Sequence, residues 1–346
     1  MLEEQAKIQL EIKKNEEEKR KKDEKLQLLE ERQIMEERRK KLEIEQKHKE
    51  DDEKLRQEEE EKKELAKKKE NEKKISVQAK MQGAIISKEI ICKKVFREPE
   101  INGHAENAIW DNTSSFAVVV RNIKGLEKSL AIKSVYTTNY IYFYIQWEDY
   151  TENVTHKTWL WDKNTKQYIT GDDIEDKLNL MFAIKNNFSA CMLTGLDYQA
   201  DLWEWAAAKT NPSGFADDQK ITISTKPIKR ANSFKSNNGR KVWIKNDFDP
   251  GSASYEQNII IDYKWDKVPR YIPKNPTGSR ADIKAKGVWK DSIWMLEMRR
   301  KLLTDDKEND VQFNTNKKYP FAIAIYDHEE LNNHYTSDEL LLIFVQ

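Results

Sequence analysis

The chain has 346 residues and carries 61 Lys and Arg against 61 Asp and Glu, so its formal net charge is zero. This balance argues against the global basic field of a nucleic-acid-binding protein. The two cysteines, Cys92 and Cys191, are too few for a disulfide scaffold and lack the spacing of a cysteine-based zinc site. No apolar run approaches the roughly 20 residues of a membrane span.

The first predicted domain, residues 1–82, consists almost entirely of Glu, Lys, Arg and Gln. Opposite charges recur three and four residues apart, and no Pro or Gly occurs before Gly83, which predicts a long charged helix. Its apolar residues are sparse for a heptad seam. Two alternatives stay open: a solvated single helix or weak coiled coil, and a coiled coil that needs a partner, through which the chain would self-associate.

The second predicted domain, residues 83–346, holds all ten tryptophans. Residues 135–147 are typical of a β-hairpin, with Tyr140, Tyr142 and Tyr144 on one face and aliphatic or Phe side chains on the other. Further strands are predicted at residues 84–95, 116–120, 221–224, 258–263, 285–289, 292–299, 319–326 and 340–345.

Many short strands separated by turn residues predict a mainly β fold, an antiparallel β-sandwich. Residues 201–209 are expected to form one short helix. Residues 226–257 and 264–284 are polar and rich in Gly, Pro and Asn, and we expect them to be long loops. Catalytic motifs are missing: the sequence contains no Gly-x-Ser-x-Gly, no phosphate-cradling Gly-rich loop and no His-Glu-x-x-His. The chain is therefore predicted not to be an enzyme.

An ordered series of motifs runs through the second domain. It comprises Ile-Asn-Gly at 101–103 with Trp110, Gln-Trp-Glu-Asp-Tyr-Thr at 146–151, residues 176–182, 188–191 and 201–205, Asn-Pro-Ser-Gly-Phe-Ala-Asp-Asp at 211–218, residues 239–240, 285–294, 297–302, 310–313 and 319–324. In this order the segments resemble the haem-binding domain of ethylbenzene dehydrogenase γ subunits and related cytochromes of the DMSO-reductase class. The resemblance covers roughly residues 85–346.

The resemblance implies a sandwich like that of carbohydrate-binding modules, with one haem at one end. Members with covalent haem carry Cys-x-x-Cys-His after the segment that matches Phe188, and only Cys191 and Met192 remain here. The chain is therefore similar to the non-covalent branch, which binds haem b. In the γ subunits a methionine and a lysine ligate the iron. The methionine corresponds to Met181, and the window for the lysine offers His334 instead.

Several candidate site residues have alternatives that stay open. A thioether and an imidazole are both iron ligands of haem, so Met192 could replace Met181, and His328 could replace His334. Otherwise these side chains belong to the core or to loops.

For the remaining candidate residues, each role at a cofactor site has a purely structural alternative. Trp203 could cover a porphyrin or be a core aromatic. Arg240 could pair with a haem propionate or form a loop salt bridge. The acidic pairs at 172–173 and 217–218 are better explained by turn capping than by calcium, because they lack EF-hand spacing.

Two functions are compatible with the sequence. The first is an electron-transfer protein that binds one haem b through Met181 and His334, alone or with a redox partner such as a molybdenum-enzyme-type complex. The alternative is a haem-free module that binds a glycan through Trp203, Trp205, Tyr140 or Tyr142, or serves as an interaction module. The resemblance implies a periplasmic or other extracytoplasmic location, and no apolar signal segment is visible.

Overall fold

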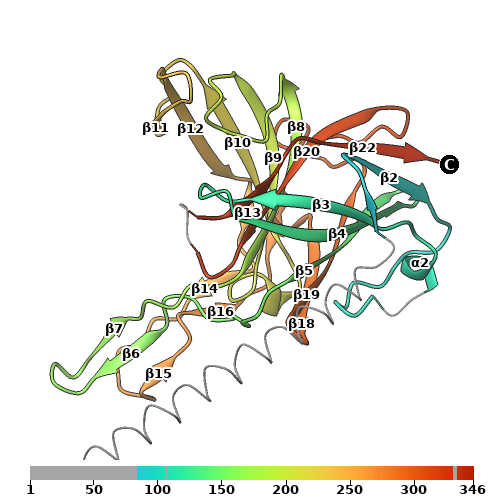
Figure 1. Cartoon of the computed structure of the whole chain (residues 1–346). Coiled ribbons are helices and arrows are strands. Elements are labelled where there is room, and N and C mark those ends of the chain that lie inside the picture. The colour runs from blue at the N-terminus through green and yellow to red at the C-terminus, as the bar shows by residue number, and fades with distance from the viewer. Residues whose placement is uncertain (1–83, 106–107, 330–332) are drawn as a thin grey trace, which may run out of the picture. The chain divides into compact units, whose positions relative to one another are not determined.

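The computed structural model describes residues 84–105, 108–329 and 333–346. The predicted charged helix and its self-association, over residues 1–82, lie outside the described residues. Within the described part, the prediction of a mainly β fold is confirmed (Figure 1). No helix in this part is both long and apolar enough to cross a membrane.

One sheet of 15 strands makes up most of the fold. Its strands are β1 (Ile85–Ile86), β2 (Glu89–Lys94), β3 (Phe116–Arg121), β4 (Glu127–Tyr136), β5 (Tyr140–Glu148), β8 (Lys177–Asn186), β9 (Tyr198–Ala206), β10 (Asp217–Ser224), β11 (Asn232–Lys235), β12 (Lys241–Phe248), β18 (Lys284–Lys290), β19 (Ile293–Lys301), β20 (Lys318–Tyr326), β21 (Tyr335–Ser337) and β22 (Leu340–Val345).

The sheet folds over itself into two layers. The first layer has the order β11-β12-β10-β9-β8-β20, and the second has the order β3-β4-β5-β19-β18. Two paths of paired strands connect the layers. Strand β21 pairs with both β20 and β3, and β22 pairs with β20 and with β2, which in turn pairs with β4. The predicted sandwich is therefore correct, but it is not purely antiparallel, because β1 and β2 pair in parallel with their neighbours.

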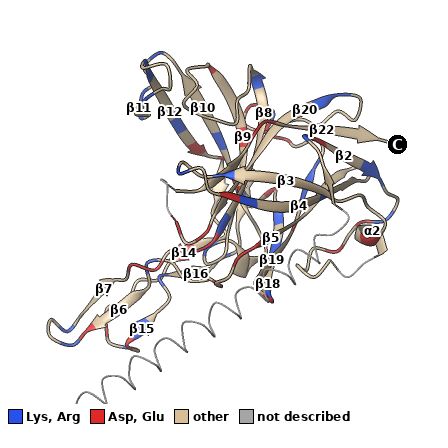
Figure 2. Ribbon diagram, viewed as in Figure 1, with Lys and Arg blue, Asp and Glu red and all other residues tan. Residues whose placement is uncertain are grey.

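Small elements surround the sandwich. They are the strands β6 (Trp159–Asp162), β7 (Gln167–Thr170), β13 (Gly251–Ser252), β14 (Tyr255–Gln257), β15 (Lys267–Val268), β16 (Tyr271–Pro273) and β17 (Thr277–Gly278), and the short helices α2 (Ala108–Asp111), η1 (Asn211–Ser213) and η2 (Ser279–Ala281). Strands β6, β7 and β15 form a separate three-stranded sheet, which we call the arm (Figure 1). Figure 2 shows Lys and Arg interspersed with Asp and Glu over the described strands.

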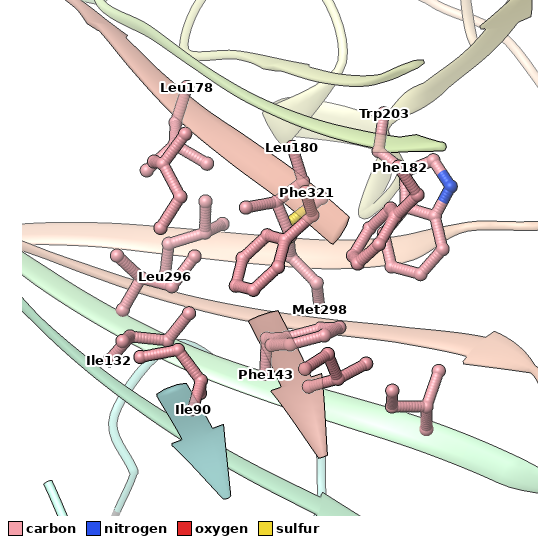
Figure 3. Packing of buried hydrophobic residues seen from close by; sticks show 14 of the residues in the cluster. Ile90, Ile132, Phe143, Leu178, Leu180, Phe182, Trp203, Leu296, Met298 and Phe321 are labelled. Carbon is pink, nitrogen blue, oxygen red and sulfur yellow. The ribbon is translucent and has the colours of Figure 1, made fainter. Parts of the chain in front are cut away.

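The core lies between the two layers. The predicted hairpin is confirmed, since β4 and β5 pair and Ile141, Phe143 and Ile145 alternate into the core. Phe143 of the second layer packs on Phe182 and Trp203 of the first, with ring centroids 5.8 and 6.0 Å apart (Figure 3). These contacts across the layers bury aromatic surface that neither layer could bury alone.

Several local predictions are wrong. The strand predicted at residues 258–263 is not formed, and the loop predicted at 264–284 contains β15, β16, β17 and η2. Residues 201–209 were expected to be helical, but residues 198–206 form strand β9 between β8 and β10. The alanines that follow Trp205 favour helix locally, and tertiary pairing overrides that preference because Trp203 and Trp205 both enter the core. Residues 226–257 were expected to be a loop, yet they contain β11 and the eight-residue strand β12.

Candidate functional site

The two faces of strand β8 have different surroundings. Leu178, Leu180 and Phe182 point between the layers, where each is 0% exposed. Met181 points the other way, as side chains alternate along a strand, and it is 5% exposed. Met181 is thus buried on the outer face of the first layer, apart from the main core.

A second apolar cluster surrounds Met181 on this outer face, and we call it the outer cluster. Its members are Met181, Phe188, Tyr198, Ala200, Leu202, Ile221, Ile223 and Ala322, with Ala183, Ala190, Met192 and Ile244 packed against them. The segment 187–197, which connects β8 to β9, supplies Phe188, Ala190 and Met192 and thereby covers the strands.

Two specific contacts fix the 187–197 segment, which we call the covering segment, against the strands. The Tyr198 hydroxyl donates to the Ser189 carbonyl at 2.7 Å, and the Phe188 and Tyr198 rings meet edge to face at 5.6 Å. Burial raises the pKa of the Tyr198 hydroxyl, because its charged form is disfavoured away from water. The outer cluster is therefore closed by one connecting segment of the chain.

The turn that carries Arg240 bonds to the same segment. The Asn237 backbone N–H donates to the Leu193 carbonyl at 2.8 Å, and its side-chain amide reaches Cys191 Sγ at 3.7 Å. Arg240 itself is exposed, three residues further along this turn. The 187–197 segment therefore contacts both the outer cluster, through Met192, and the turn that carries Arg240.

The histidine candidates lie elsewhere on the same face. The His334 ring stacks on Tyr326 with centroids 4.7 Å apart. Tyr326 is four residues beyond Ala322, which pairs with Met181 in the sheet. Four residues of strand span roughly 13 Å, so Met181 and His334 are not adjacent in this structure. His328 is exposed and its ring contacts Asp327 at 2.7 Å.

The tryptophan and tyrosine candidates are mostly buried in the interior. Trp203 and Trp205 are 0% exposed on the inner face of β9, opposite the outer cluster, which agrees with the alternative that they are core aromatics. Tyr142 is also 0% exposed, and the Arg299 guanidinium lies 4.6 Å from the Tyr140 ring centre. These rings are not presented on the surface as a glycan platform would be.

Several sequence motifs act as internal braces. The buried Glu297 carboxylate accepts hydrogen bonds from Trp110 Nε1 at 2.7 Å and from the backbone N–H groups of Asn102 and Gly103 at 3.0 and 2.7 Å. Gly103 has a φ of +84°, a conformation that favours glycine. The Ile-Asn-Gly and Trp110 motif is thereby tied to β19.

A second brace joins the Asn-Pro-Ser-Gly motif to β18. The Asn211 side chain donates to the Gly287 carbonyl at 3.0 Å and accepts from the Gly287 N–H at 2.8 Å and from Trp205 Nε1 at 3.1 Å. A Cβ at Gly287 would lie 2.4 Å from the Trp205 ring. This close approach explains why the position holds glycine.

The acidic pairs behave differently from one another. Asp173 accepts from the Thr158 N–H at 2.9 Å, a bond between segments 15 residues apart and not the turn capping that was predicted. Asp217 and Asp218 begin strand β10 and cap no turn. Asp217 pairs with Arg280 at 2.8 Å, while Asp218 is 0% exposed in an acidic cluster that sequence reasoning missed, because its members are far apart in the chain.

A search of curated proteins finds no match. Two solved structures of a family 9 carbohydrate-binding module from Caldicellulosiruptor kristjanssonii, in complex with glucose and with cellotriose, are similar to this chain. They share 10% and 9% identity with it, and their TM-scores are 0.34 and 0.33. Each match covers 74% of this chain and 95% or 93% of the other, and the similarity is too weak to bear on function.

A family comparison covers more than half of the chain. The family model described as ethylbenzene dehydrogenase matches residues 105–337, a range that includes both layers and the outer cluster. The chain belongs to the ethylbenzene dehydrogenase family.

Proposed function

We propose that residues 83–346 form a haem-binding electron-transfer domain that takes one non-covalent haem b against the outer cluster, with Met181 as an iron ligand. The observation that carries this proposal is the position of Met181. Its thioether lies in a dry apolar cluster beneath the 187–197 segment, which corresponds to the segment that bears the covalent haem in related proteins. Family membership supports a role as one subunit of a redox complex.

The residues around Met181 fit a haem. Four alanines, at positions 183, 190, 200 and 322, line the outer cluster and keep its walls small. A thioether is a soft ligand suited to haem iron, and apolar surroundings keep water from the metal. Arg240, on the turn bonded to the covering segment, would pair with a propionate in this proposal.

The geometry favours Met192 as the second ligand. Met192 packs against the outer cluster from the covering segment, so it reaches the same face as Met181 without rearrangement of the strands. His334, the partner predicted from the sequence, would have to leave Tyr326 and approach along β20. His334 therefore remains the competing candidate.

The bound haem would supply a one-electron couple between ferric and ferrous iron. The chain's own groups would set the potential of that couple. A methionine ligand and an apolar, dry cluster both favour the reduced state, because the ferric form carries the additional charge. No substrate chemistry is assigned to the domain, which we propose to be an electron carrier.

Haemin titration of the purified full chain tests the proposal. We expect one haem per chain and sharp α and β bands on reduction. Met181→Leu should weaken haem binding at least tenfold or convert the spectrum to a high-spin form. Met298→Leu, the matched change at a core methionine that is 0% exposed, should leave both unchanged. A protein that takes up no haemin contradicts the proposal.

The second ligand is identified by the same spectra. If Met192 ligates the iron, Met192→Leu gives a high-spin spectrum and His334→Ala leaves the low-spin bands intact. The reverse pattern identifies the Met181–His334 pair. If both variants keep the low-spin bands, neither side chain is the second ligand.

A second candidate function rests on the arm and its connecting segment. Ile259, Ile261 and Trp265 are 81%, 89% and 72% exposed, and the Trp161 ring packs on Tyr263 at 5.0 Å. Exposed aromatic and aliphatic side chains in one region favour an interaction module that binds a protein or a glycan. Glycan-array binding that is lost on Trp265→Ala and retained on Trp203→Phe would support the glycan form of this function.

A further inference from the structure

An acidic cluster lies inside the sandwich, on the opposite side of the first layer from Met181. Asp201 of β9 and Asp218 of β10 are on the inner face, since Asp218 pairs with Trp203 in the sheet register. Asp310 joins them from the segment between β19 and β20, and one carboxylate oxygen of each of the three lies within 4.8 Å of the others. Asp249, at the end of β12, forms a second such group with Asp306 and Asp310.

The cluster contains more acceptors than donors. Asp201 Oδ2 accepts from Arg300 Nη1 and, at 2.8 Å, from the Val311 N–H. Six other buried oxygens accept no hydrogen bond from an N–H or hydroxyl group of the described residues: Asp201 Oδ1, Asp218 Oδ1 and Oδ2, Asp249 Oδ1, and Asp310 Oδ1 and Oδ2. Asp310 is only 1% exposed, so water cannot satisfy its carboxylate from the surface.

The charges are also unbalanced. Three carboxylates, those of Asp201, Asp218 and Asp310, surround one guanidinium, Arg300, which is 0% exposed and lies 3.9 Å from Asp218 Oδ2. Isolated buried charges of this kind are costly, so the site requires either protons or a cation.

We propose that the carboxylates of Asp201, Asp218 and Asp310 bind one Ca²⁺ ion inside the sandwich, with Asp249 next to Asp310 at its edge. Calcium takes six to eight oxygen ligands at roughly 2.3–2.6 Å, so opposite ligands lie about 4.6–5.2 Å apart. One carboxylate oxygen each of Asp201, Asp218 and Asp310 lies within 4.8 Å of the other two, close enough to share one ion, and this group of described residues consists of oxygen donors, which calcium prefers. Magnesium prefers shorter distances and retains several waters, for which this buried site leaves little access.

The bound ion would join distant parts of the fold. Asp310 belongs to the segment that closes one end of the core, where Phe313 packs on Phe182 and Trp203 with centroids 5.3 and 6.3 Å apart. Calcium would therefore anchor this segment to β9 and β10. The role is structural and does not depend on haem binding.

Thermal unfolding of the full chain at pH 7 tests the site. After removal of metal with a chelator and dialysis, we expect added Ca²⁺ to raise the midpoint by several degrees in a concentration-dependent way, as for a ligand that binds only the folded state. Calorimetric titration should give one Ca²⁺ per chain. Mg²⁺ at the same concentration should have at most a tenth of the apparent affinity.

Substitutions locate the ion. Asp218→Asn keeps the shape of the side chain and should abolish the response to Ca²⁺, as should Asp310→Asn if the first variant fails to fold. Asp149→Asn removes a buried carboxylate from a different acidic group, formed by Asp149, Asp176 and Asp327, and should retain the full response.

Two results overturn the proposal. One is a metal-free wild type whose midpoint does not respond to Ca²⁺ in the millimolar range, which would mean that the carboxylates are kept neutral by protons alone. The other is an equal loss of response in Asp218→Asn and Asp149→Asn, which would place the ion elsewhere.

Discussion

The inner and outer faces of β8 and β9 are built from the same two strands but serve different purposes. On the inner face, Phe182 and Trp203 pack against the second layer and are 0% exposed. On the outer face, Met181 and Ala200 are covered by a single connecting segment. Opening the inner face would separate the layers, whereas the outer face could admit a ligand by movement of that segment alone. The haem that we propose would therefore enter on the outer face, where it need not separate the layers.

The largest expected effect is on the inner face. Trp203→Ala removes a large buried ring that contacts Phe143, Phe182 and Phe313, and it should lower the free energy of unfolding by about 3–5 kcal/mol. Met181→Leu on the outer face conserves volume and should cost less than about 1.5 kcal/mol. Urea unfolding of the metal- and haem-free proteins measures both. Equal losses in the two variants would contradict the distinction between the faces.

A slightly smaller effect is expected at the Glu297 brace. Glu297→Ala leaves three N–H donors, two of them buried, without this acceptor and should destabilise the fold by about 3 kcal/mol. Haemin binding by the folded fraction should not change, because Glu297 lies on β19 and outside the outer cluster. Glu339→Ala, an exposed position, serves as the control and should stay within about 0.5 kcal/mol of wild type. A tolerated Glu297→Ala would show that the motif is not a structural brace.

Sequence patterns predicted the sandwich and the β4–β5 hairpin because alternation along a strand is a local property. They also identified residues such as Trp110, Asn211 and Gly287, but not the roles of these residues. Those roles depend on pairings such as Asn211 with Gly287, which join segments 76 residues apart. Strand β9 was mistaken for a helix for the same reason, since only its neighbours β8 and β10 determine its form.

The candidate site was only partly predictable. Met181 could be placed in the sequence, but its burial on the outer face follows from the covering segment and from strands β9, β10 and β20. The acidic cluster could not be predicted, because Asp201, Asp218, Asp249 and Asp310 come together only when the strands and the segment before β20 are assembled.

The smallest expected effect is a dependence on pH. Burial, with Asp176 and Asp327 nearby, raises the pKa of Asp149 to about 7, and burial raises that of Asp176 to about 6. Between its ordinary pKa of about 4 and its raised pKa, such a carboxyl group keeps its proton in the folded state and loses it in the unfolded state. Stability from these groups is therefore present at about pH 4 and is lost as the pH rises to 6–7.

Urea unfolding between pH 4 and pH 8 checks this slope. Each group contributes at most about 1.4 kcal/mol per pH unit within its window. Asp149→Asn should flatten the slope between pH 4 and pH 7, while Asp247→Asn, at a half-exposed position, should leave it unchanged. A steeper slope in Asp149→Asn would contradict the assignment.

The reduced-minus-oxidised visible spectrum of haemin-reconstituted wild type, Met181→Leu and Met298→Leu tests the central claim most directly. These two methionines lie on the outer and inner faces of the sandwich, and both are buried. The account predicts sharp low-spin bands for wild type and Met298→Leu and their loss in Met181→Leu. Identical spectra in all three proteins, or no haem in any of them, would contradict it.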